Sequence, residues 1–135
     1  MRVTIMLADA AQESGGKLYV LGGGWSVTGP DIPPSALAMK IDVPWDQANM
    51  KHTWQLELVS EDGVPVSIED QTVRIEGEFE VGRPPGAAPG SYIDVPLAVN
   101  FGSLPLAPGR RYVWQFAIDG ENNDDWDREF FVRPA

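Results

Sequence analysis

The chain has 135 residues, of which 43% are hydrophobic, and its 20 acidic and 10 basic residues give a formal net charge of −10. This length predicts a single domain spanning residues 1–135, and the excess of carboxylates disfavours nucleic acid and anionic membranes as partners. The absence of cysteine excludes disulfides, Cys-ligated zinc and thiol catalysis.

Targeting signals are not evident in the sequence. The N-terminal segment MRVTIMLADAAQES holds one basic residue, and its short apolar run is broken by Asp9, which is atypical of a signal peptide. No apolar run approaches the roughly 18–20 residues that a membrane-spanning helix needs. We therefore expect a soluble protein without a signal peptide, located in the cytoplasm or in a virion.

Strands are predicted where apolar and polar residues alternate. In chain order they lie near 2–8, 17–27, 37–43, 52–59, 73–81, 93–101, 112–118 and 127–133. Turn residues separate these segments, and strict alternation means that each strand buries only one face. The pattern predicts an all-β protein, a single antiparallel β-sandwich of about eight strands.

Three consecutive glycines, Gly22 to Gly24, interrupt the second predicted strand. No lysine follows them as a phosphate-binding loop requires, and Val27 stands where a dinucleotide fingerprint needs glycine. We therefore expect a bulge or a bend, or a place where a bulky neighbour such as a tryptophan lies on bare backbone.

The longest segment without strand character, residues 82–91, is rich in Pro and Gly. It is either a slack loop or a stiff extended arm that a partner protein can grip. Pro96 cannot donate to a strand ladder, which predicts that 92–101 is an edge strand or is bulged there. The candidate interaction residues of this region are Arg83, Pro84, Pro85, Pro89 and Pro96.

Two tryptophans, Trp45 and Trp126, precede aspartates in predicted loops or at strand ends. Each either caps the end of the core or stacks on a sugar ring. We include both among the candidate interaction residues.

Evidence for catalysis is weak. His52 is the only histidine, and it begins an amphipathic strand without a serine or aspartate at a recognisable catalytic spacing. We expect a solvated histidine at a strand end, and a protein that is not an enzyme.

The segment 119–127 is the one candidate metal site. It carries oxygen ligands of the kind that Ca²⁺ prefers at alternate positions, Asp119, Glu121, Asn123, Asp125 and Asp127. The segment does not match an EF-hand loop, and the same residue types are expected in a hairpin turn without any metal. Turn and calcium site both remain open.

Two stretches resemble known families. Leu106-Ala107-Pro108-Gly109-Arg110-Arg111-Tyr112 resembles the tyrosine corner of fibronectin type III and related Ig-like domains, which implies an Ig-like sandwich. The words LADAAQ, GKLYVLGGGW and VPWDQAN are similar to those of a family of small uncharacterised proteins from actinobacteria and their phages. That second resemblance implies no activity.

We expect a non-enzymatic structural or interaction module that binds protein, either by self-association or within a larger assembly. An accessory or decoration subunit of a phage particle is one concrete form. The alternative is a calcium- or carbohydrate-binding module that uses the loops 119–127 and 44–50, which would lie at the same end of an Ig-like sandwich.

Overall fold

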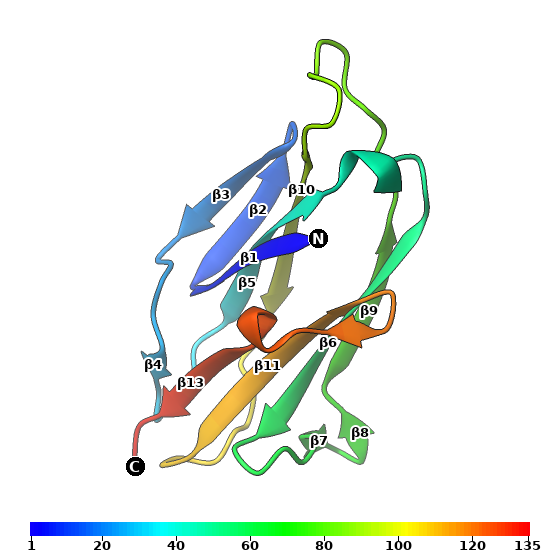
Figure 1. The fold of residues 1–135 in the computed structure, drawn as a ribbon. Helices are drawn as coiled ribbons and strands as arrows, with labels where there is room; N and C mark the ends of the chain where they lie inside the picture. The colour runs from blue at the N-terminus through cyan, green and yellow to red at the C-terminus, as the bar shows by residue number, and fades with distance from the viewer.

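The computed structural model describes residues 1–135 as a β protein in which two sheets face each other (Figure 1). The first sheet has the order β1-β5-β10, formed by β1 (Arg2–Ala8), β5 (Ser35–Val43) and β10 (Ile93–Phe101). The second has the order β4-β13-β11-β6-β9, formed by β4 (Val27–Thr28), β13 (Arg128–Val132), β11 (Arg111–Ile118), β6 (His52–Ser60) and β9 (Arg74–Phe79). Their pairs are antiparallel except β4 with β13, which is parallel.

Short elements complete the chain. They are the hairpin β2 (Ala10–Ser14) and β3 (Lys17–Leu21), the pair β7 (Ser67–Ile68) and β8 (Gln71–Thr72), β12 (Glu121–Asn122) beside β11, and the 3₁₀ turns η1 (Trp45–Gln47) and η2 (Asp124–Trp126). Every predicted strand overlaps a strand of the structure, and the segment 17–27 is divided into β3 and β4. The alternation did not predict β2, β7, β8 and β12.

The core lies between the two sheets. It takes the inward-facing residues of both sheets, and the largest side chains without exposure are Phe116, Leu37, Met39, Ile41, Leu56, Leu58, Val43 and Val132. In β11 and β6 every second residue is buried, as the alternating sequence predicted. Removal of this apolar surface from water is the main stabilising contribution to the fold.

The hairpin β2–β3 packs over the outer face of the first sheet (Figure 1). Ala36 and Ala38 of β5 and Ala98 of β10 face Ala11 of β2, and these small side chains allow a close approach of the strands. The amide of Asn100 donates to the carbonyl oxygen of Ala11 at 2.8 Å and accepts from its N–H at 3.2 Å. The outward face of the first sheet is therefore partly covered by the chain itself.

The glycines after β3 turn the chain, as predicted, but no tryptophan lies on them. Gly22 and Gly24 have φ of 59° and 93°, values that favour glycine. A Cβ on Gly22 would overlap the carboxylate of Asp9, and one on Gly23 would lie 2.6 Å from the sulfur of Met6. The tryptophan that covers a glycine is Trp54, which lies on Gly77.

In the turn before β11, a tyrosine hydroxyl is hydrogen-bonded to the backbone a few residues upstream, as in a tyrosine corner. The N–H of Ala107 donates to the hydroxyl of Tyr112 at 2.9 Å, and Tyr112 itself is buried. Its ring stacks on Phe130, with the ring centroids 5.8 Å apart. The hydroxyl thus fixes the turn to the strand that follows it.

We expect Tyr112→Phe to lower the free energy of unfolding by about 1–2 kcal/mol, because the Ala107 N–H loses its acceptor while the ring still packs. Chemical denaturation measures this loss. Tyr92→Phe is the matched control, since Tyr92 is an exposed residue, and it should leave stability within about 0.5 kcal/mol of wild type. Equal effects of the two variants would contradict a structural role of the hydroxyl of Tyr112.

Candidate functional site

His52 connects the two loops that were predicted to lie at the same end of the sandwich. Its Nδ1 lies 2.7 Å from the Oδ2 of Asp119, and its Nε2 lies 2.9 Å from the carbonyl oxygen of Gln47. The imidazole stacks on Phe79, and the residue is only 4% exposed. The expectation of a solvated histidine was wrong, because β6 buries its first residue between the segments 44–50 and 119–127.

Both ring nitrogens of His52 face acceptors, which favours the doubly protonated imidazolium. Burial lowers the pKa of His52, but the Gln47 carbonyl and the Asp119 carboxylate together raise it above its usual value. Burial raises the pKa of Asp119, whereas the hydrogen bonds from His52 and the Thr53 N–H, with the charge of His52, bring it below its usual value. When His52 is protonated, the arrangement is an ion pair with one buried member.

The five predicted calcium ligands are not gathered around a common centre. The side chain of Asn123 caps η2 by accepting from the N–H of Asp125 at 2.9 Å, and Asp119 is engaged by His52. Asn122 donates to Asp127 at 3.3 Å. No three acidic or histidine side chains of the structure lie together as a group that could hold a metal ion.

The pKa of Asp127 is raised above its usual value, first by burial and then by the nearby charge of Asp124. The hydrogen bond from Asn122 and the charge of Arg128 act in the opposite direction. Arg128 itself is held by carbonyl oxygens, with its Nη1 donating to those of Asp125 and Asp127 at 2.9 and 2.6 Å. Contacts within 119–127 and to the neighbouring strands thus hold this segment as a turn.

We expect the melting temperature to be the same in millimolar Ca²⁺ and in EDTA, since the predicted acidic ligands do not gather around one centre. A site filled at 100-fold excess over its dissociation constant would add about 2.7 kcal/mol of stability, an effect of several degrees. A shift that disappears in Asp125→Asn/Asp127→Asn would contradict this expectation and support the calcium-binding alternative. A shift that survives the double substitution would place a metal site elsewhere.

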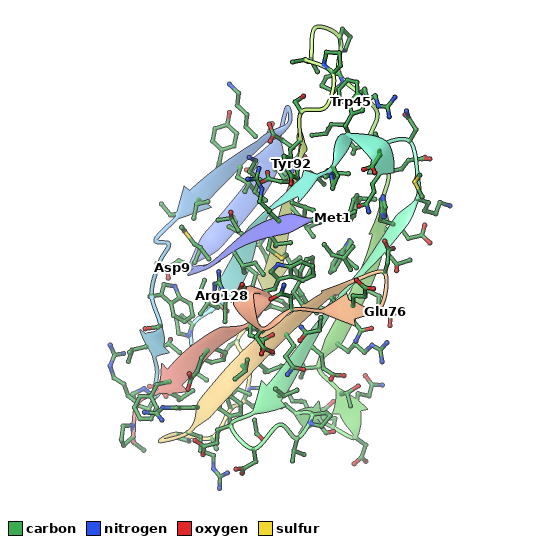
Figure 2. All side chains as sticks on the ribbon, viewed as in Figure 1. Met1, Asp9, Trp45, Glu76, Tyr92 and Arg128 are labelled. Atoms are coloured by element: carbon green, nitrogen blue, oxygen red, sulfur yellow. The ribbon has the colours of Figure 1, made fainter.

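Arg83 and Trp45, predicted as interaction residues on separate segments, contact each other. The Nη2 and Nε of Arg83 donate to the carbonyl oxygen of Trp45 at 2.8 and 3.2 Å, and the guanidinium carbon lies 4.6 Å from the ring centroid. Figure 2 shows Trp45 at the base of the loop that projects beyond the sheets. The root of the Pro/Gly segment is therefore fixed, while Pro84, Pro85 and Pro89 remain exposed.

Trp126 lies in η2, which contacts β1 and β11. It is half-buried and packs against Phe116 of the core, with the ring centroids 6.2 Å apart. Each of the two tryptophans thus has a partner within the chain, Arg83 for Trp45 and Phe116 for Trp126. This favours the interpretation that Trp126 caps the core.

Most sheet edges are protected against pairing with another strand. Pro96 lies within β10, which is an edge strand as the sequence predicted, and Glu76 and Glu78 alternate along β9. Two carbonyls of the β1 edge are occupied, because Arg128 Nε donates to Ile5 at 2.9 Å and the Gly24 N–H donates to Leu7 at 2.7 Å. β4 is only two residues long.

β3 is the exception. It pairs only with β2, and Figure 1 shows it on the outer side of the hairpin. Three consecutive apolar residues, Tyr19, Val20 and Leu21, are 57%, 41% and 71% exposed, and the only charge on the strand is Lys17 at its first position. An exposed apolar edge of this kind is a typical place for strand addition.

A family model matches residues 3–128, which is nearly the whole chain. The chain belongs to DUF6941, a family of unknown function. No curated protein and no solved structure is similar enough to the chain to count as a match. No helix of the structure has the length and apolar composition needed to cross a membrane.

The part of the chain that matches DUF6941 contains the hairpin β2–β3, the His52 pair and the Arg83–Trp45 contact. Membership confirms the expectation of an uncharacterised family and assigns no chemistry. The β3 edge was missed because the segment Lys17–Leu21 was treated as part of one long strand. A signal was present in the sequence: residues Leu18 to Leu21 are all apolar and do not alternate with polar residues. In the structure these residues lie outside the core.

Proposed function

We propose that this protein is a non-enzymatic protein–protein interaction module, a subunit of an assembly that binds another strand along the edge of β3. The observation that carries the proposal is the contrast between the edges: β1, β9 and β10 are protected, whereas β3 exposes Tyr19 and Leu21. Strand addition supplies affinity through main-chain hydrogen bonds and specificity through alternate side chains.

Two finer points belong to this proposal. The sandwich is of the Ig-like type, which is supported by the Tyr112–Ala107 bond and by the order β13-β11-β6-β9 opposite β1-β5-β10. An accessory or decoration subunit of a phage particle is the concrete form that the resemblance to proteins of actinobacteria and their phages suggests. A location in the cytoplasm or the virion follows from that form.

A comparison of two lysine substitutions tests the proposal. Leu21→Lys places a charge on the β3 edge, while Val64→Lys places one on an exposed valine that is 59% accessible and outside β2–β3. Two measurements apply: capture of a protein from an extract of the source cells, and the mass of the protein in solution. We expect Leu21→Lys to abolish the capture or the self-assembled form, and Val64→Lys to preserve it. Identical binding and mass for wild type and both variants would contradict the use of the β3 edge.

A further inference from the structure

We propose that the strand added to β3 is the β3 of a second copy of this chain, which forms an antiparallel, two-fold symmetric dimer. The inference rests on the proposed function and names the partner. It comes from the direction of the backbone groups of β3 and from the positions of two unpaired charges at its ends.

The hairpin register determines which backbone groups are free. Ser14 and Lys17 flank the two-residue turn, and in such a hairpin they exchange hydrogen bonds, as does every second pair beyond them. The pairs Gln12–Tyr19 and Ala10–Leu21 are therefore bonded, so the N–H and C=O groups of Leu18 and Val20 face away from β2. These are the groups that a further strand would meet.

Antiparallel pairing about a two-fold axis at Tyr19 uses all of these groups. Leu18 of each copy then stands opposite Val20 of the other, in a hydrogen-bonded pair, and the two copies of Tyr19 face each other on the axis. Lys17 of each copy stands opposite Leu21 of the other. The two hairpins become one four-stranded sheet, and the exposed rings of Tyr19 cover each other.

The charges at the two ends of β3 are complementary in this arrangement. Asp9 lies at the Leu21 end, since its N–H donates to the Leu21 carbonyl at 3.0 Å and its carboxylate approaches Gly22 (Figure 2). Lys17 lies at the other end, and neither side chain belongs to an ion pair within the chain. Two-fold pairing brings Lys17 of each copy within a side chain's reach of Asp9 of the other.

The net charge of −10 disfavours association at long range, but many carboxylates lie far from this edge. Glu76, Glu78 and Glu129 are exposed on the second sheet, whereas the hairpin covers the first. In ~0.1 M salt, repulsion between exposed charges is largely screened beyond a Debye length of about 10 Å. A small interface on one hairpin is expected to give a weak, concentration-dependent dimer.

Charge reversal in two separate chains tests the geometry. In sedimentation equilibrium from about 1 µM to about 1 mM, we expect wild type to dimerise and Lys17→Glu and Asp9→Lys each to weaken the dimer by about tenfold. In an equimolar mixture the introduced glutamate of one variant would meet the introduced lysine of the other, and the unchanged Lys17 would meet the unchanged Asp9. The two variants are therefore expected to form a mixed dimer with wild-type affinity. Lys51→Glu and Asp62→Lys, at exposed positions outside the hairpin, are the controls of equal charge change.

Val20→Pro removes an outward-facing N–H, and we expect it to abolish dimerisation. Circular dichroism and melting curves must show that each variant is folded. A wild-type chain that stays monomeric at about 1 mM, or a dimer that both charge reversals leave unchanged, would overturn self-pairing. A monomer that still binds another protein in a Leu21-dependent way overturns self-pairing and leaves the proposed function standing, while a monomer that binds nothing contradicts both.

Discussion

The protein is expected to lose stability as the pH rises above 6.5, the usual pKa of histidine, because His52 must remain protonated to satisfy both of its acceptors. The folded chain raises the pKa of His52 above its usual value of 6.5. A group with a raised folded pKa stabilises fully below its unfolded pKa, and this contribution is lost as the pH rises through the folded pKa. The loss of stability at low pH depends on Asp119.

Asp119 has the opposite sign. Its folded pKa lies below the usual value of 3.8, so its contribution is present above that value and is lost as the pH falls through the folded pKa. The pair therefore stabilises most between about pH 4 and about pH 6.5. The chain has one histidine and no cysteine, so His52 is the only side chain whose usual pKa lies between about pH 5 and about pH 8.

His52→Leu is expected to lower the free energy of unfolding by about 2 kcal/mol at pH 6 and to flatten its dependence on pH above that. The loss is below the ~3–5 kcal/mol of a fully buried pair, because the side chain of Asp119 is 48% exposed. Urea denaturation at a series of pH values measures both effects. Asp119→Asn should also reduce the slope above pH 6, whereas Asp124→Asn, at an exposed residue of η2, should not.

A profile for His52→Leu that keeps the wild-type slope would contradict the assignment. The imidazole would then not be the group whose protonation is linked to folding. Equal slopes for Asp119→Asn and Asp124→Asn would show that general repulsion among carboxylates, rather than the His52 pair, controls the stability.

The alternation of side chains predicted most of the fold because neighbouring residues alone show which face of a strand is apolar. The segment 112–118 shows this, since its apolar residues Tyr112, Trp114, Phe116 and Ile118 are all buried in the structure. The seven residues from Leu106 to Tyr112 likewise predicted a turn that the Tyr112 hydroxyl closes. In both cases the sequence signal lies within a few neighbouring residues.

Contacts between distant segments were not predictable in this way. His52 and Asp119 are 67 positions apart, and no sequence motif predicts that they contact each other. Arg83 and Trp45 were each identified as exposed candidates, but only the fold brings them into contact. The same holds for β3, since its lack of protection becomes visible only when the edges of all the strands are compared.

Gly77→Ala is expected to be among the most destabilising single substitutions outside the core, because a Cβ there would lie 2.5–2.6 Å from the indole of Trp54. The two residues are directly opposite in the pairing of β6 with β9. Trp54 is 8% exposed and its ring lies beside that of Phe116, with centroids 6.3 Å apart, so it has little room to move. Overpacking of this kind costs about 1–3 kcal/mol.

The matched control is Gly102→Ala. A Cβ added at Gly102 would have no atom within 4 Å, and the residue has no positive φ, so the methyl group meets open space. We expect it to leave the free energy of unfolding unchanged or to raise it by up to about 0.5 kcal/mol, through reduced freedom of the unfolded chain. Gly77→Ala should lower the same quantity by about 2 kcal/mol, and the melting temperature by several degrees.

A double-mutant cycle identifies Trp54 as the cause. Trp54→Phe shortens the ring that covers the glycine, so Gly77→Ala should cost about 1 kcal/mol less in that background than in wild type. The coupling is expected because the two substitutions change a single contact across one strand pair. If the free-energy costs of the two substitutions simply add, the steric contact with Trp54 is not the cause. Gly77 would then be required only for its backbone conformation.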